Sequence, residues 1–134
     1  MNYIAVVHHE EGSATGVHFP DVPGCFAAAD DPSDILPNAI AALEDFFADS
    51  QEVTEARGIE AIRLEAKEDL AEGAYLMAVP HIPNLSKVER VNVSLEKGLL
   101  NAIDNHVKLA GFKTRSAFFA IAATNEIKQN RESA

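Results

Sequence analysis

Residues 88–95 constrain the fold of this chain most, because their side chains alternate between apolar and polar. The apolar side chains fall on one side of an extended segment and are Val91, Val93 and Leu95. The polar side chains fall on the other side and are Arg90, Asn92 and Ser94. This alternation predicts a half-buried β-strand. A single short strand is not stable by itself, so the segment needs a second strand to pair with.

Two helices are predicted after this strand. Apolar residues recur at three- and four-residue spacing from about 96 to 110, and Gly111 is a typical residue to end such a helix. Thr114 can cap a second helix over about 115–129. A strand and two helices within about 45 residues form too small a core to be stable alone, which predicts dimerisation.

This arrangement resembles the ribbon-helix-helix family of DNA-binding proteins. The match covers residues 88 to about 129, and its specific parts are residues 90–95 and 111–118. In that family two strands pair into an antiparallel ribbon that lies in the major groove of DNA. The resemblance implies that three outward side chains contact base edges, namely Arg90, Asn92 and Ser94. It also implies that the start of the second helix binds a DNA phosphate through Lys113, Thr114, Arg115 and Ser116.

Both sets of residues also have a purely structural interpretation. The polar side chains of 90–94 are compatible with the solvated face of an edge strand, and residues 114–116 are compatible with a simple helix cap. The helices that follow and the positive local charge favour the DNA-binding interpretation. Capping and phosphate binding can occur together at one helix start.

Residues 1–80 predict a separate α+β domain with the order β-β-β-α-β. Short β-branched or aromatic runs predict strands at about 3–7, 15–19, 25–29 and 74–79. An acidic, proline-containing stretch at 30–34 predicts a helix start. The apolar stripe that follows it predicts a helix that reaches the mid-fifties and stops near Gly58, and residues 59–72 predict a connector or a short helix.

Two prolines in residues 80–86 interrupt any regular structure and predict a linker at 81–87. The expected organisation is therefore an α+β domain at 1–80, this linker, and a DNA-binding domain at 88–134.

The charge of the chain is distributed unevenly between these parts. Residues 1–86 hold 3 basic and 16 acidic side chains, a net charge of −13, whereas residues 87–134 hold 8 basic and 5 acidic side chains, a net charge of +3. This asymmetry predicts two modules with different partners. The acidic module should repel DNA and suit a basic partner, and the C-terminal module can contact phosphate.

The N-terminal part resembles the HicB antitoxins, through Phe-Pro-Asp-Val-Pro-Gly-Cys at 19–25 and the strand, acidic helix start and alanine-rich helix after it. With the C-terminal match, the resemblance spans nearly the whole chain. It implies a degenerate ribonuclease H-like fold joined to the ribbon-helix-helix module. It further implies a non-enzymatic antitoxin that neutralises a small basic RNA-cleaving toxin, HicA, and represses its own operon. Our hypothesis for the mechanism is occlusion, in which the acidic module covers the RNA-binding face of the toxin. The implied partners are therefore a HicA-like toxin, operator DNA and further copies of the chain, as a dimer or higher oligomer.

No catalytic residue, cofactor or metal site is expected. Neighbouring strand residues point to opposite faces, so His8 and His9, followed by Glu10 and Glu11, do not readily share one ion. The N-terminal aspartates suit turn and capping chemistry better than a two-metal nuclease site; they are Asp21, Asp30, Asp31 and Asp34.

Other features predict a cytoplasmic protein without a membrane segment. Cys25 is the only cysteine, which fits a reducing cytosol and a small buried apolar residue better than a nucleophile. No apolar run approaches the roughly 20 residues that span a bilayer. The start of the chain lacks the basic and small-residue features of a signal peptide.

Two other functions stay open at this point. The first is a ribbon-helix-helix regulator whose N-terminal domain senses a small ligand or forms oligomers. The second is a metal-dependent nuclease that uses the N-terminal carboxylates.

Overall fold

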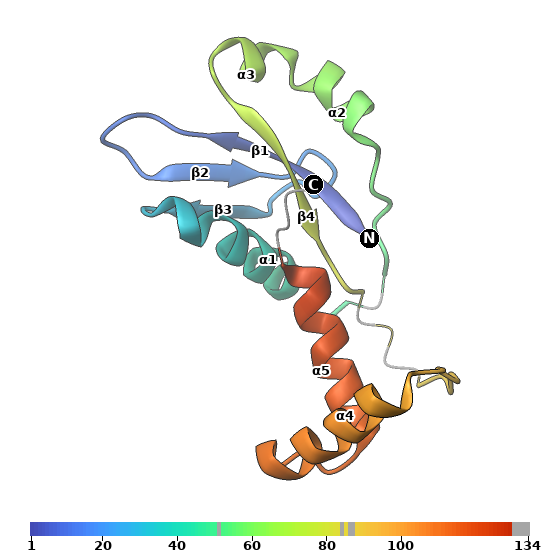
Figure 1. Ribbon diagram of the computed structural model, residues 1–134. Coiled ribbons are helices and arrows are strands. Elements are labelled where there is room, and N and C mark those ends of the chain that lie inside the picture. Colours follow the sequence, from blue (N-terminus) through green and yellow to red (C-terminus); the bar gives the residue numbers. More distant parts are fainter. Residues whose placement is uncertain (51, 84, 86–87, 130–134) are drawn as a thin grey trace. The chain divides into compact units, whose positions relative to one another are not determined.

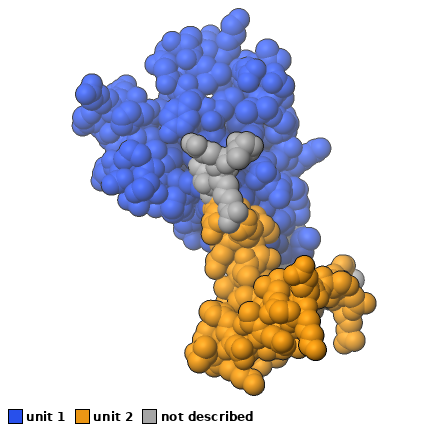
Figure 2. Space-filling view, in the orientation of Figure 1, with its two compact units in different colours: residues 1–85 blue, residues 86–134 orange. Residues whose placement is uncertain are grey.

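The computed structural model describes all residues except 51, 84, 86–87 and 130–134 (Figure 1). The chain divides into two compact units, Met1–Leu85 and Ser86–Ala134 (Figure 2). The first unit contains a sheet and helices, and the second unit contains two helices. Positions 84, 86 and 87 of the predicted linker and positions 130–134 of the predicted DNA-binding domain lie outside the described residues.

The first unit is built on a four-stranded antiparallel sheet with the strand order β3-β2-β1-β4 (Figure 1). Its strands are β1 (Asn2–His8), β2 (Thr15–His18), β3 (Phe26–Ala29) and β4 (Tyr75–Pro80). The first strand pairs with β2 on one side and with β4, the most distant strand in the sequence, on the other. Each strand lies where the sequence predicts one, which confirms the mixed α+β class.

Helices cover both faces of this sheet. On one face, α1 (Ile35–Phe46) packs against Tyr3, Ala5 and Val7. On the other face, α2 (Ile59–Glu65) packs against Ile4 and Val6 and is followed by α3 (Lys67–Ala71). Because β1 is buried on both faces, its sequence is a continuous apolar run and not an alternating one.

The predicted end of the first helix is wrong. The helix stops at Phe46, and Gly58 does not end it but precedes α2 as the residue at its N-terminal cap. Its start follows the expectation, because Asp31 caps a short 3-10 turn (Pro32–Asp34) that leads directly into α1.

Long-range contacts explain the early stop. Phe47 is 7% exposed, and its ring stacks on that of Tyr3 at a centroid distance of 6.0 Å. The Tyr3 hydroxyl donates a hydrogen bond to the carbonyl of Thr54, and the backbone N–H of Arg57 donates to Asp21 at 2.7 Å. The bond to Asp21 keeps Arg57 outside a helix, because its single N–H cannot also donate to the carbonyl four residues earlier, and the bond from Tyr3 ties Thr54 to the sheet.

The second unit contains α4 (Lys97–Ala110) and α5 (Arg115–Lys128). Gly111 ends α4 with a φ of 79°, a conformation that favours glycine. The Thr114 hydroxyl accepts a hydrogen bond from the N–H of Ala117 at 3.1 Å and so caps α5. Both helices and their boundary residues agree with the sequence prediction. Among the described residues, no helix combines the length and hydropathy that a bilayer span requires.

Candidate nucleic-acid interface

Residues 88–96 precede α4 and form neither a helix nor a strand within a single chain. All of them are exposed, including the three proposed base-contacting residues Arg90, Asn92 and Ser94. A segment becomes a strand only when its backbone pairs with another, and one copy of this segment offers no such pairing. The strand at 88–95 therefore stays a prediction.

The apolar side chains of this segment share a groove of about 970 Å³ with both helices of the second unit. The apolar residues that line it are Val88, Val91, Val93 and Leu95 from the segment, Leu100 from α4, and Phe119, Ala120 and Ala123 from α5. Arg90 also lines the groove, whereas Asn92 and Ser94 do not.

Among the described residues of the second unit, many apolar side chains are exposed. Ile103 is the only buried residue of α4, and among the described residues of α5 none is buried. Val91 and Val93 remain 75% and 64% exposed. A patch of this kind is typical of a protein interface, because the helices cannot gain their usual burial free energy within one chain.

The predicted phosphate-binding residues lie together at the start of α5. Thr114 is the cap, Arg115 and Ser116 open the helix, and Lys113 precedes it; all four are exposed. The first amides of a helix have no intrahelical acceptor and carry the positive end of the helix dipole, so this position suits an anion.

The side chain of Arg115 already forms an ion pair within the second unit. Its guanidinium donates to both carboxylate oxygens of Asp104 on α4, at 2.7 and 2.8 Å. These hydrogen bonds lower the pKa of the Asp104 carboxyl and raise the pKa of Arg115. The ion pair joins the two helices and partly neutralises the cation that the sequence assigns to DNA.

Of the four N-terminal aspartates, Asp31 caps a turn as predicted, whereas Asp34 makes no capping hydrogen bond with its side chain and Asp21 forms a long-range ion pair. The carboxylate of Asp21 binds the backbone and the guanidinium of Arg57. The carboxylate of Asp31 accepts from the backbone N–H and the hydroxyl of Ser33, and the backbone N–H bond is the largest cause of its lowered pKa. Among the described residues, these aspartates do not gather into a cluster that holds a metal ion.

Cys25 lies in the core of the first unit and is 3% exposed. Burial raises the pKa of its thiol, which keeps the thiol protonated and unreactive. The position agrees with the prediction of a small buried apolar residue.

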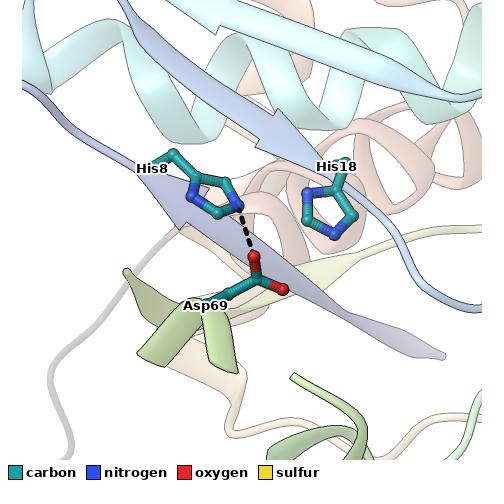
Figure 3. Close-up of side chains that lie close together, drawn as sticks. All are labelled: His8, His18 and Asp69. Carbon is teal, nitrogen blue, oxygen red and sulfur yellow. Dashed lines mark ion pairs between the residues drawn. The ribbon is translucent and has the colours of Figure 1, made fainter. Parts of the chain in front are cut away.

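The structure contains a cluster of possible metal ligands that the sequence did not predict. His8, His18 and Asp69 each offer a ligand atom, and these three atoms lie within 4.8 Å of one another (Figure 3). His8 Nε2 is 3.8 Å from an oxygen of Asp69, and the two imidazole rings stack at a centroid distance of 5.3 Å. The spacing of these residues along the chain is uninformative, because only the pairing of β1 with β2 and the placement of α3 bring them together.

Comparison with known proteins places the chain among bacterial antitoxins. Residues 3–123 match the family described as the HicB-like antitoxin of bacterial toxin–antitoxin systems. An uncharacterised 14.9 kDa protein of Haemophilus phage HP1 is 31% identical over 117 residues, which cover 83% of this chain and 86% of that protein.

Two solved structures share the fold over nearly the full length of both chains. The crystal structure of the antitoxin HicB3 has 26% sequence identity and a TM-score of 0.55, and it covers 95% of this chain and 98% of its own. The crystal structure of the Burkholderia pseudomallei antitoxin HicB has 32% identity and a TM-score of 0.51, with 92% and 96% covered.

Proposed function

Because the chain belongs to the family of HicB-like antitoxins of bacterial toxin–antitoxin systems, we propose that its first unit neutralises a small RNA-cleaving toxin and its second unit binds operator DNA as a dimer. Members of this family are antitoxins and not enzymes. Binding of the operator by the same chain that binds the toxin would repress the operon that encodes both.

The charge of the first unit supports a basic, HicA-like toxin as its partner. Residues 1–86 carry a net charge of −13. A protein that cleaves RNA needs a positive surface to hold its substrate, and an acidic domain that covers this surface excludes the RNA. Helices on both faces of the antiparallel sheet support a degenerate ribonuclease H-like fold, now used as a binding surface.

The observation that carries the DNA-binding part is the uncovered apolar groove of the second unit. If the segments at 88–95 of two chains pair in an antiparallel ribbon, Val91, Val93 and Leu95 are covered by the helices and by the other copy. The alternating side chains then face outward, and they are Arg90, Asn92 and Ser94. Arginine suits the O6 and N7 atoms of guanine, and asparagine suits the N6 and N7 atoms of adenine.

The start of α5 supplies the second contact with DNA in this proposal. A phosphate at this position accepts hydrogen bonds from the first amides of the helix, and the side chains of Lys113, Thr114 and Ser116 lie beside it. Arg115 contributes its backbone amide, since its guanidinium is held by Asp104.

The test uses the full chain together with a small basic protein encoded by a neighbouring gene. The two proteins should co-purify, and the chain should stop the RNA cleavage by that protein at an equimolar ratio. The chain alone should shift DNA from upstream of its own gene as a dimer. Absence of a complex with the neighbouring protein contradicts the antitoxin assignment, whereas a monomeric chain that does not shift this DNA contradicts only the DNA-binding part.

A further inference from the structure

His8, His18 and Asp69 come from three different elements of the first unit (Figure 3). His8 ends β1, His18 ends β2 and Asp69 lies in α3. Their three ligand atoms lie within 4.8 Å of one another, and each residue is partly exposed, so solvent reaches the cluster.

The pairing of the strands fixes the two histidines on one face of the sheet. His18 lies directly opposite Val6, and His8 follows Val6 by two residues, so both imidazoles project from the same face. The residue opposite His8 is Gly16, and no side chain there fills the space beside the ring. The rings are nearly parallel, with an interplanar angle of 18°.

Buried contacts place Asp69 over the same face. Ile62 and Ala66, from α2 and the turn after it, pack against Ile4 and Val6. Asp69 follows Ala66 by three residues, which brings its carboxylate to the same side of the helix as that buried contact. Core contacts therefore fix the elements that carry the three ligands, while the ligand side chains themselves lie at the partly exposed edge of the unit.

We propose that this cluster, the His8–His18–Asp69 site, binds a divalent transition-metal ion of the Zn²⁺ type. Two imidazoles and one carboxylate form a donor set that favours zinc over magnesium or calcium, which prefer oxygen ligands. Zinc holds nitrogen and oxygen ligands at about 2.0–2.2 Å, so ligand atoms on one tetrahedral ion lie about 3.3–3.6 Å apart. The 3.8 Å between His8 Nε2 and Asp69 Oδ1 is already close to that separation.

Three protein ligands leave one position of a tetrahedral ion for water. A hollow of about 290 Å³ opens beside the cluster and is lined by His18, Pro20, Glu65, Ala66 and Asp69. This volume exceeds the ~30 Å³ of one water molecule many times. The carboxylate of Glu65 lies in the same hollow but pairs with Arg57 at 2.8 Å, so water is the expected fourth ligand.

A bound ion would link the β1–β2 hairpin to α3. Metal binding adds to the stability of a fold whenever the folded state presents the ligands together and the unfolded chain does not. The expected role of the ion is therefore to stabilise the packing of α3 on the sheet of the first unit.

His9 provides a matched control. It is adjacent to His8, but its Nδ1 lies 2.8 Å from the hydroxyl oxygen of Thr15, so its hydrogen bond is made within the hairpin and not toward Asp69. A substitution at His9 removes one imidazole from the same β1–β2 hairpin without removing a proposed ligand.

The experiment titrates the full chain, without a histidine tag, with Zn²⁺ in a calorimeter and with Co²⁺ by visible absorption. One equivalent should bind, and the cobalt spectrum should have the intensity of a low-symmetry site with nitrogen ligands. His8→Gln, His18→Gln and Asp69→Asn should each weaken binding by about tenfold or more, whereas His9→Gln should leave it unchanged. Zinc should also raise the melting temperature of the wild type and of His9→Gln, but not of the other variants.

Two results would overturn the proposal. One is a wild-type chain that binds no Zn²⁺ at millimolar concentration. The other is binding that survives in the double variant His8→Gln/His18→Gln, which would place the ion elsewhere. Circular dichroism of the metal-free variants verifies their folding, and the partial exposure of all three side chains makes these substitutions compatible with the native core.

Discussion

The guanidinium of Arg115, at the first position of α5, donates hydrogen bonds to both carboxylate oxygens of Asp104 on α4, with nitrogen–oxygen distances of 2.7 and 2.8 Å. The arrangement is the parallel two-bond geometry that guanidinium and carboxylate groups prefer. It sits at the helix start where the second unit is proposed to hold a DNA phosphate. If the second unit binds DNA as proposed, Asp104 competes with the DNA phosphate for this cation.

Replacing Asp104 by asparagine should strengthen DNA binding. The substitution releases the guanidinium of Arg115 to phosphate and removes one negative charge beside the backbone of the DNA. Affinity should rise several-fold, and the slope of log K against log salt should steepen by about 0.9, the value for one further phosphate contact. Fluorescence anisotropy at several salt concentrations measures the affinity and this slope. A loss of affinity would show instead that the ion pair positions the helix.

Arg90→Ala and Asn92→Ala should remove sequence discrimination and leave both the dimer and toxin neutralisation intact. Each bidentate base contact provides about 1–3 kcal/mol of discrimination, so the ratio of operator to scrambled-DNA affinity should fall about 5- to 150-fold. Lys113→Ala is the matched comparison, because a lost phosphate contact weakens binding to both DNAs equally. If either segment variant retains the wild-type ratio, the proposed ribbon is wrong.

A fragment of residues 1–85 should fold and bind the toxin but not DNA. The first unit includes residues beyond the last strand, because the backbone N–H of His81 donates to the carbonyl of Met1 at 2.8 Å and its ring packs against Phe47. A fragment that ends at residue 80 lacks these contacts and should melt at a lower temperature. Calorimetry with the purified toxin measures binding, and a folded 1–85 fragment that gives no heat would contradict the proposed division of labour.

His81→Phe should reduce the loss of stability at acidic pH. Burial lowers the pKa of His81 below its ordinary value of about 6.5, so the unfolded chain binds a proton that the folded chain excludes. The free energy of unfolding therefore falls as the pH drops below about 6.5, by at most about 1.4 kcal/mol per pH unit for this one group.

Urea denaturation of both proteins between pH 7.5 and 5.0 checks this prediction. The phenylalanine ring keeps the contacts with Tyr3 and Phe47 and removes a buried nitrogen that has no hydrogen-bond partner among the described residues. The variant should thus be at least as stable as the wild type at pH 7.5. Its advantage in the free energy of unfolding should grow as the pH falls. Parallel pH profiles would rule out His81 as a contributor.

The sequence predicts those parts of the fold that local chemistry determines. Gly111 and Thr114 mark the boundary between α4 and α5. Gly111 adopts the left-handed conformation that ends α4, and the Thr114 hydroxyl accepts the amide hydrogen bond that caps α5. The apolar run in β1 predicts a buried strand. The end of α1 was not predictable in the same way, because Tyr3 and Asp21 set it from more than thirty residues away.

In the candidate sites, too, the sequence predicts what local residues determine and not what long-range contacts determine. Residues 113–116 are found at a helix start as their own pattern predicts, but the bond from Arg115 to Asp104 depends on how the two helices pack. The His8–His18–Asp69 site requires a strand register and a helix placement, neither of which has a local signature. The pairing of residues 88–95 depends on a second chain, and one chain alone does not determine it.

The central place of β1 in the sheet has a consequence for biosynthesis. Its neighbour β4 ends at Pro80, so the sheet is complete once the first 85 residues have left the ribosome. Domains generally fold as units during translation, with the N-terminal one first. The first unit can therefore reach its native state on a nascent chain, before the second unit, which we propose pairs with another chain, has emerged from the ribosome.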